Sequence, residues 1–526
     1  MTAMKTPGVY IVEKDEFPNS VVEVATAVPV FIGYTEKAID GTMSLLNKPK
    51  RITSMGEFHN FFGGAPLLQF GVYDERPEDG AGGFLEAKLS DKATYYISVP
   101  PLYNLYYHML LFYANGGGTC YIVSAGGYDY AEFPERKALS NGINNLLKEQ
   151  EPTLLVIPEA VNLKSADECY MLQQDMLNHC GNVMKNRFAI LDVWEGIDFG
   201  TSDYSPIEKF RNGIGDNFLS FGAAYFPWLE TSIVSDSEIS WENIKNWENW
   251  IKKIGENFKN EDALQSKLKA IIDIYFTDKI KTVEIDGEID DEGKTKTRPL
   301  TADELFNLKN SLHLSLVQNW EGYGIIFETI KNRINLLPPS AAIAGIYNTV
   351  DNTKGVWKAP ANISINSVVK PSVNITHEEQ EDLNIPMNGK AINAIRFFVG
   401  EGINIWGART LDGNSLDWRY INVRRTIIFI EESVKNAVSA YVFEPNNAVT
   451  WVNIKGMIGN FLRAVWKRGG LAGSSPEDAY SVHIGLGDTM TPEDILEGIL
   501  RVTVLVAISR PAEFIEITFQ QQMQKS

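Results

Sequence analysis

Apolar runs and helix-like stretches alternate along residues 27–230. Continuous apolar runs are typical of buried strands, and they occur at Ala27–Gly33, Cys120–Val123, Thr153–Ala160 and Arg187–Val193. An aromatic, helix-like stretch spans Leu102–Tyr113. Strands that alternate with helices predict an α/β layer built on a partly parallel sheet.

The spacing of apolar residues changes after Ser240. Apolar side chains then recur at steps of three and four, which predicts an amphipathic helix, at Trp241, Ile244, Trp247, Ile251, Ile254 and Phe258. We expect its apolar face to pack within its own domain rather than to bind a partner. An acidic hairpin at Val283–Arg298 and a helix start at Thr301–Glu304 follow. The sequence therefore predicts an insertion over residues 236–335 that is displayed on a surface.

The last third of the chain mixes strands and short helices. Leu336–Gly407 is rich in Pro, Asn and Gly and shows few helical patterns, so strands and loops are predicted there. Further on, the pattern predicts strands at Thr426–Glu431 and Val502–Ile508 and helices at Glu432–Phe443 and Val449–Arg468. Pro at a first helical position predicts two more helix starts, at Ser475-Pro476 and Thr491-Pro492.

Each end of the chain carries a short strand-like segment. The first comprises Pro7, Gly8, Val9, Tyr10, Ile11 and Val12, and the second comprises Pro511, Phe514, Ile515, Ile517 and Phe519. A polar stretch, Glu13–Ser20, separates the first from the rest of the chain. Such strands either pair within their own subunit or complete a sheet in another subunit, and the pattern alone favours the first alternative.

Composition narrows the possible partners. The 526 residues carry a net charge of −19, which disfavours binding to nucleic acid and to anionic membranes. No apolar run approaches the length of a membrane helix, and the N-terminus lacks the pattern of a secretory signal. The three cysteines, Cys120, Cys169 and Cys180, cannot all pair within one chain, so a reducing compartment is expected.

Motifs for catalysis, cofactors and metals are missing. The six histidines show no zinc-ligand spacing, and the chain has no phosphate-binding G-x-x-x-x-G-K-[ST] loop. We therefore expect no catalytic residue, no cofactor and no metal. Ser54 superficially resembles the serine of a subtilisin-like protease, but a helix cap before Phe58 is the favoured interpretation.

Ten ordered motifs resemble the contractile tail sheath family, which forms the sheaths of phage tails, R-type pyocins and extracellular contractile injection systems. They are Lys5–Glu13, Thr26–Tyr34, Pro338–Gly345, Gly355–Asn362, Asn393–Arg396, Trp406–Leu411, Trp418–Arg425, Val442–Asn446, Gly469–Gly473 and Arg510–Phe514. The resemblance covers the N-terminal arm and most of residues 336–520. It is weak over residues 40–335 and absent over the insertion.

This resemblance implies an α/β (α+β) protomer with a C-terminal α/β domain near an inner tube and a non-catalytic outer domain of subtilisin-like topology. It also implies extended strands at both termini that neighbouring subunits exchange. The expected segments are an N-terminal exchange arm at 1–25, the first part of the outer domain at 26–235, the insertion at 236–335, the outer domain completion and linker at 336–410, the tube-proximal domain at 411–510 and a C-terminal exchange arm at 511–526.

The resemblance further implies the partners. We expect stacked hexameric rings of this chain around an inner tube protein, with baseplate and terminal cap proteins at the ends, no nucleic acid and no direct membrane contact. Assembly is expected in the bacterial cytoplasm, as part of a phage tail or an injection particle. A type VI secretion sheath is less expected, because such sheaths divide their parts between two proteins.

Two groups of residues receive expected roles in this framework. Basic residues on the predicted helix Val449–Arg468 are candidates to face the tube: Lys455, Arg463, Lys467 and Arg468. A solvated basic face is equally compatible with them. The second group carries structural motifs, with ion pairs expected at the arginines: Trp406, Arg409, Trp418, Arg424, Arg425 and Glu444.

Two other functions stay open from the sequence. A cytosolic subtilisin-like hydrolase would use Ser54. A surface-binding module would use the insertion helix and the acidic hairpin.

Overall fold

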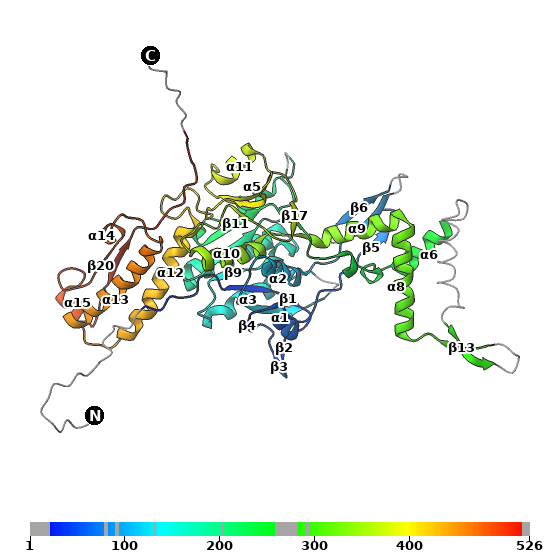
Figure 1. Cartoon of the computed structure of the whole chain (residues 1–526), viewed down its shortest axis with the longest axis horizontal. Coiled ribbons are helices and arrows are strands. Elements are labelled where there is room, and N and C mark those ends of the chain that lie inside the picture. The colour runs from blue at the N-terminus through cyan, green and yellow to red at the C-terminus, as the bar shows by residue number, and fades with distance from the viewer. Residues whose placement is uncertain are drawn as a thin grey trace, which may run out of the picture. The chain divides into compact units, whose positions relative to one another are not determined.

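The computed structural model describes residues 21–77, 83–89, 94–129, 133–201, 204–257, 282–289 and 295–517 (Figure 1). The chain forms two compact units. The C-terminal unit comprises Met1–Thr26, Val350–Ala359 and Tyr420–Ser526, and the outer unit comprises Ala27–Thr349 and Pro360–Arg419. Residues 350–359 thus join the C-terminal unit, although the sequence placed them in an outer segment at 336–410.

The described residues of the outer unit are built on a nine-stranded sheet. Its order is β16 (Ile363–Ser364), β19 (Gly402–Trp406), β18 (Ile392–Phe398), β11 (Gly222–Phe226), β10 (Phe188–Asp192), β9 (Leu154–Val156), β1 (Pro29–Thr35), β8 (Cys120–Gly127) and β4 (Lys50–Ile52). The strands from β8 to β18 run parallel. β4 pairs antiparallel with β8, β19 pairs antiparallel with β18, and β16 pairs antiparallel with β19. The predicted α/β layer is confirmed.

The order of the parallel strands identifies a doubly wound sheet. β1 lies between β8 and β9, and β10, β11 and β18 follow outward in chain order. This is the order of flavodoxin-like doubly wound folds. The subtilisin-like topology expected for the outer domain stays a prediction.

Helices cover both faces of this sheet (Figure 1). On one face, α3 (Arg136–Asn144), α4 (Ala166–Asn178) and α5 (Pro206–Gly213) share an apolar cluster with Ile32 and Val123. The next residue along β1 points to the opposite face, because side chains alternate along a strand. There Phe31 meets Phe112 of α2 (Leu105–Ala114), with ring centroids 5.1 Å apart. The predicted helix at 102–113 is thus confirmed at α2.

Two helices lie where strands and loops were predicted. Residues 340–347 of α10 (Ser340–Lys354) are all buried, so this half of the helix has no polar face and no helical period. α11 (His377–Asn384) has the reverse composition, being mostly polar and exposed. The expectation of few helices over 336–407 was therefore wrong, since each helix lacks the contrast between faces that pattern reading needs.

The insertion packs on strands from an earlier part of the chain. Among its described residues, the helices are α6 (Trp247–Asn257), α8 (Ala302–Asn319) and α9 (Glu321–Asn335). They accompany a sheet in the order β5 (Gly71–Tyr73), β7 (Thr94–Ser98) and β6 (Phe84–Lys88). Trp250 of α6 lies between Tyr95 of β7 and Tyr323 of α9, at centroid distances of 6.1 and 5.6 Å. The apolar face of the amphipathic helix therefore packs within its own domain, as expected.

Smaller elements complete the outer unit. The predicted helix from Trp241 begins as a 3-10 turn at Trp241–Asn243 and becomes α-helical at Trp247; Phe258 lies outside the described residues. The predicted acidic hairpin is present as β13 and β14. The remaining elements are β13 (Thr282–Ile289), β14 (Thr295–Pro299), β2 (Ile39–Asp40), β3 (Met43–Ser44), β12 (Leu229–Thr231), β15 (Leu336–Leu337), β17 (Val368–Pro371) and α1 (Met55–Phe62).

The described residues of the C-terminal unit form two long helices beside a small sheet. α12 (Ile421–Val438) and α13 (Ala448–Lys467) pack together, with the rings of Phe429 and Phe461 5.8 Å apart. The smaller elements are α14 (Pro476–Ala479), β20 (Tyr480–His483), α15 (Pro492–Leu496) and β21 (Thr503–Val506). The predictions of α13, of both Pro-initiated helices and of the Val502 strand are confirmed.

One prediction in this unit was wrong. Residues 426–431 form the middle of α12 rather than a strand. The run TIIFIE is rich in β-branched and aromatic residues, which favour strands, but Thr426, Ile428, Phe429 and Ile430 are all buried within the helix. Tertiary packing thus overrides the local preference. The predicted helix at 432–443 is the end of α12, followed by a 3-10 turn at Ser439–Tyr441.

Candidate assembly interface

A two-stranded sheet in the C-terminal unit has open edges. β20 and β21 pair antiparallel, from Tyr480 opposite Val506 to His483 opposite Thr503. Within the described part of the chain, no third strand pairs with either of them. An isolated two-stranded sheet is marginal in water, and three or more strands are usually needed. The backbone groups on both outer edges are therefore available to added strands.

The C-terminal segment presents apolar side chains to solvent. Phe514, Ile515 and Ile517 are 71%, 77% and 69% exposed, and residues 507–517 form no strand apart from an isolated bridge at Ile508. Phe519, the last residue of the predicted arm, lies outside the described residues, as do residues 7–12 of the N-terminal arm. Residues 511–517 of the predicted C-terminal arm thus form no strand in the described subunit.

The base of each terminal segment is held by side chains of the C-terminal unit. Near the N-terminus, Val24 N–H donates to Ser433 Oγ at 3.2 Å, and Arg425 donates to the carbonyl of Thr26 at 2.8 Å. Near the C-terminus, Tyr420 Oη–H donates to Glu513 Oε2 at 3.0 Å. The described parts of both segments therefore leave from fixed points.

One exposed side of α13 carries apolar, small and basic residues in line. At 100° per residue, five exposed residues and the half-buried Gly459 fall within one stripe, here called the α13 stripe: Val449, Val452, Gly456, Gly459, Arg463 and Lys467. Val449 and Val452 are 69% and 68% exposed. A Cβ added at Gly456 or Gly459 would meet no atom within 4 Å. The α13 stripe is therefore a flat surface with positive charge toward its C-terminal end.

The four predicted tube-facing residues do not lie together. Arg463 and Lys467 belong to the α13 stripe, and exposed Lys455 lies beside it. Arg468 points elsewhere: it forms an ion pair with Glu23 and lies over the ring of Trp357, 5.1 Å from the centroid. Arg468 is thus a contact of the N-terminal segment.

The arginines of the structural motifs are buried, and they bond in different ways. Arg425 forms an ion pair with Asp351 at 2.5 Å, with both side chains at most 3% exposed. A buried arginine needs such a partner. Arg409 is 2% exposed and donates to the carbonyl oxygens of Asn384 and Gly413 at 3.3 and 3.4 Å. Arg424 is likewise buried, at 8% exposure.

The other motif residues have more local roles. The ring of Trp406 lies 4.5 Å from that of Phe398 in the β18–β19 hairpin. The carbonyl of Trp418 accepts a hydrogen bond from Thr410 Oγ1 at 2.8 Å. Glu444 is exposed in the loop before α13. These contacts fix backbone turns.

The features considered for catalysis have structural roles. Ser54 caps α1, and its Oγ accepts a hydrogen bond from the N–H of Glu57 at 3.3 Å. Two buried carboxyls accept backbone hydrogen bonds, Glu159 from Tyr34 at 2.8 Å and Asp192 from Ser340 at 2.9 Å. Burial raises the pKa of Glu159 to about 8 and the pKa of Asp192 to about 7. Among the described residues, no group of three His, Cys, Asp or Glu side chains could hold a metal ion.

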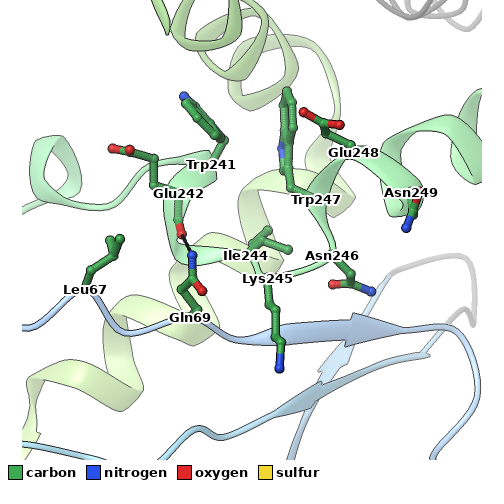
Figure 2. A pocket seen from close by; sticks show the side chains of 10 residues that line it. All are labelled: Leu67, Gln69, Trp241, Glu242, Ile244, Lys245, Asn246, Trp247, Glu248 and Asn249. Carbon is green, nitrogen blue, oxygen red and sulfur yellow. Dashed lines mark hydrogen bonds between the residues drawn. The ribbon is translucent and has the colours of Figure 1, made fainter. Parts of the chain in front are cut away.

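A groove of about 320 Å³ lies between residues 67–69 and the start of the insertion (Figure 2). Figure 2 shows the rings of Trp241 and Trp247 extending away from Gln69, whose Nε2 donates to the carbonyl of Glu242 at 3.4 Å. Trp247 is only 2% exposed, and its Nε1 donates to Tyr323 Oη. The groove is therefore lined mainly by exposed polar side chains. None of the described helices is both long and apolar enough to span a membrane.

Sequence reasoning missed the residues that hold the terminal segments. Tyr420 and Ser433 bond to residues 93 and 409 positions away. A hydroxyl on a helix gives no sign in the sequence of which distant backbone group it meets. Arg425 was found because it lies in a motif, but its partner Asp351 was not.

Comparisons with known proteins match different lengths of the chain. The family model for the phage tail sheath C-terminal domain matches residues 414–522. The tail sheath protein of Burkholderia phage BcepMu is 29% identical over 125 residues, which cover 23% of this chain and 26% of that protein. The tail sheath protein of Vibrio phage KVP40 is 21% identical over 201 residues, covering 38% and 28%. The matched segment thus spans about a quarter of the length of these curated relatives.

Similarity to solved structures extends over nearly the whole chain. The sheath complex of the extracellular contractile injection system PVC, in its contracted state, matches with 27% identity and a TM-score of 0.57 over 99% of both chains. The contracted helical sheath of the anti-feeding prophage matches with 25% identity and a TM-score of 0.56, over 99% of this chain and 100% of that one. A chain of the anti-feeding prophage baseplate structure is 26% identical, with a TM-score of 0.57.

Proposed function

We propose that this chain is a member of the contractile tail sheath family and the structural subunit of a sheath that surrounds an inner tube and contracts to drive the tube into a target. The proteins that it resembles are tail sheath proteins, which are structural proteins and not enzymes. The helix-capping role of Ser54 removes the basis for a hydrolase. In this proposal, hexameric rings of the subunit stack helically on the tube.

The observation that carries the proposal is the sheet β20–β21 with two open edges, beside an exposed apolar C-terminal segment. A sheet with two open edges can accept two strands, and each subunit has one strand-like segment at either end of its chain. We propose that neighbouring subunits supply these strands, from residues 7–12 of one neighbour and 514–519 of another. The marginal two-stranded sheet then becomes a four-stranded one.

The size of the edges limits the strength of each connection. β20 and β21 have four residues each, so an outer edge offers about four backbone groups. At about 0.5–1.5 kcal/mol net for each hydrogen bond, one added strand contributes about 2–6 kcal/mol, with side-chain burial in addition. A subunit joined by several such strands remains connected while its body rotates. Contraction then needs no nucleotide hydrolysis, because the extended lattice stores the energy when it assembles.

The α13 stripe is the proposed contact with the tube. Its apolar and glycine positions permit close approach of another surface, and Arg463 and Lys467 favour an acidic partner. The basic end is a local feature, because residues 420–526 contain ten Lys and Arg against eleven Asp and Glu. The partners in this proposal are other copies of the chain, the tube, the baseplate and a terminal cap. The subunit assembles in the bacterial cytoplasm.

An extracellular injection particle is the proposed setting. The sheath chains of the PVC particle and of the anti-feeding prophage each match over 99% of this chain, at 27% and 25% identity. Neighbouring genes test this choice: capsid and terminase genes beside this one would contradict it and indicate a phage tail.

Proline at Ile517 tests the strand exchange. Proline cannot donate to a ladder and is found essentially only at sheet edges or bulges. Because Ile517 is 69% exposed, Ile517→Pro should leave the subunit folded but prevent long sheaths in electron micrographs. Ile517→Thr, which keeps the N–H, is the matched control and should still form sheaths. Deletion of residues 1–15 tests the other arm, and intact long sheaths from either the deletion or the proline variant would contradict the exchange.

A further inference from the structure

We propose that α12 is the common anchor of both terminal segments, because hydrogen bonds to Val24 and Thr26 and to Ser509 and Glu513 meet on this one helix and its N-cap. In an assembled sheath, α12 would carry tension from the arm at one end of the chain to the arm at the other. This inference rests on the proposed sheath function. The anchoring itself can be measured on the unassembled subunit.

The N-terminal base is held at two levels of α12. Arg425 near its start donates to the carbonyl of Thr26 at 2.8 Å, and Ser433, two turns further on, accepts from Val24 N–H at 3.2 Å. Val21 and Val24 also pack against the apolar cluster that includes Phe429 and Ile430 of α12. A partly exposed ion pair between Glu23 and Arg468 connects the same segment to the C-terminal end of α13. Residues 21–26 are thus fixed along the helix.

The C-terminal base meets the first turn of the same helix. Tyr420, the N-cap residue, donates from its hydroxyl to Glu513 at 3.0 Å, and Asn422 Nδ2 donates to the carbonyl of Ser509 at 3.0 Å. Ser509 Oγ–H also donates to the carbonyl of Gly469 at 3.1 Å. Beyond Glu513, the side chains of 514–517 are exposed. The C-terminal base therefore ends near residue 513.

α12 is itself held by a segment from elsewhere in the chain. Arg425 pairs with Asp351 at 2.5 Å in a site where both side chains are at most 3% exposed, and Asn422 donates to the carbonyl of Trp357 at 2.9 Å. Arg425 and Asn422 thus each bond both to this segment and to a terminal base. In a site with little access to water, such bonds are electrostatically stronger than they would be in water. A pull on either arm would consequently act on the whole helix.

The test removes single hydroxyl groups at each base and leaves the buried ion pair intact. Ser433→Ala removes the acceptor of Val24 N–H, and Tyr420→Phe removes the donor to Glu513. Lys435→Gln is the matched control, because Lys435 lies on the same helix but bonds only to neighbouring Glu432 among the described residues. Val24→Pro removes the N–H that donates to Ser433 and is the second variant, should Ser433→Ala prevent folding.

Two measurements decide the outcome. Hydrogen exchange on the unassembled subunit should be about tenfold faster at 21–26 in Ser433→Ala and at 509–514 in Tyr420→Phe, with β20–β21 and the control unchanged. Contracted sheaths of these variants should break into shorter pieces than those of the wild type or the control. Unchanged exchange at both bases would overturn the anchoring. Loosened bases with contracted sheaths of full length would overturn the mechanical role. A wild-type chain that forms no sheath would instead contradict the proposed function and leave the exchange result valid.

Discussion

Replacing two glycines of the α13 stripe by alanine should stabilise the subunit and weaken its assembly. Gly456 and Gly459 lie in the interior of a 20-residue helix, where glycine costs about 1 kcal/mol relative to alanine. A Cβ at either position would meet no atom of the subunit within 4 Å. Gly456→Ala with Gly459→Ala should therefore raise the free energy of unfolding of the C-terminal unit by about 2 kcal/mol. In a unit of this size, that corresponds to a rise in Tm of about 5 °C.

Assembly should change in the opposite direction. If the α13 stripe packs closely against the tube, two added methyl groups keep the surfaces apart and weaken every contact around the glycines. The double variant should be more stable as a subunit and yet form few or no sheaths on tubes. Thermal unfolding of the unassembled subunit and electron microscopy after co-expression with the tube protein measure the two effects.

Gly324 supplies the control for this experiment. It lies within α9 of the outer unit, and a Cβ there would also meet no atom within 4 Å. Gly324→Ala should give a similar gain of about 1 kcal/mol in local stability without any effect on assembly. Normal sheaths from the Gly456/Gly459 double variant would refute the close contact. A loss of assembly in Gly324→Ala would show that the assay does not report on the α13 stripe.

Three further changes test the electrostatics and the packing. Arg463→Glu with Lys467→Glu should weaken sheath formation on tubes at low and moderate salt while leaving thermal unfolding unchanged. Lys37→Glu, an exposed change in the outer unit, is the control and should affect neither sheath formation nor thermal unfolding. Burial raises the pKa of Asp192 from 3.8 to about 7, so the folded state binds the proton more tightly and stability falls as pH rises between these values. Urea unfolding at pH 5 and pH 8 measures this fall in the free energy of unfolding, and Asp192→Asn should remove the part that is due to Asp192. The part due to Glu159, whose pKa burial raises to about 8, should remain. An unchanged pH dependence in the variant would contradict the assignment to Asp192. Tyr323→Phe should destabilise the insertion by about 2–4 kcal/mol, because Trp247 Nε1 and His313 Nδ1 each lose a hydrogen-bond partner at 2.9 Å. Hydrogen exchange in α6 and α8 measures the effect. A cost below about 0.5 kcal/mol would argue against this buried network.

The pattern of the sequence was most informative where two faces of an element differ. α6 and α13 each have one buried and one exposed side, and their spacing of apolar residues predicted them. The first half of α10, residues 340–347, is buried throughout and α12 carries a strand-like run, so the helix at 340–354 was missed and residues 426–431 were assigned to a strand. The spacing of apolar residues reflects a difference in burial between the two faces of an element, and not how deeply the element is buried. Elements without that contrast, whether buried like the first half of α10 or exposed like α11, are therefore the ones that local reading misassigns.

The candidate interface divides in the same way. The sequence by itself determined that apolar strand-like segments lie at both ends of the chain, that basic residues gather on α13, and that residues 236–335 have their own pattern. These are properties of neighbouring residues, which local spacing records. Only the tertiary structure decided that Arg468 meets Glu23, that Arg425 pairs with Asp351 and holds Thr26, and that the insertion shares its aromatic core with β7. Such contacts join positions tens to hundreds of residues apart, and their geometry depends on how the whole chain packs.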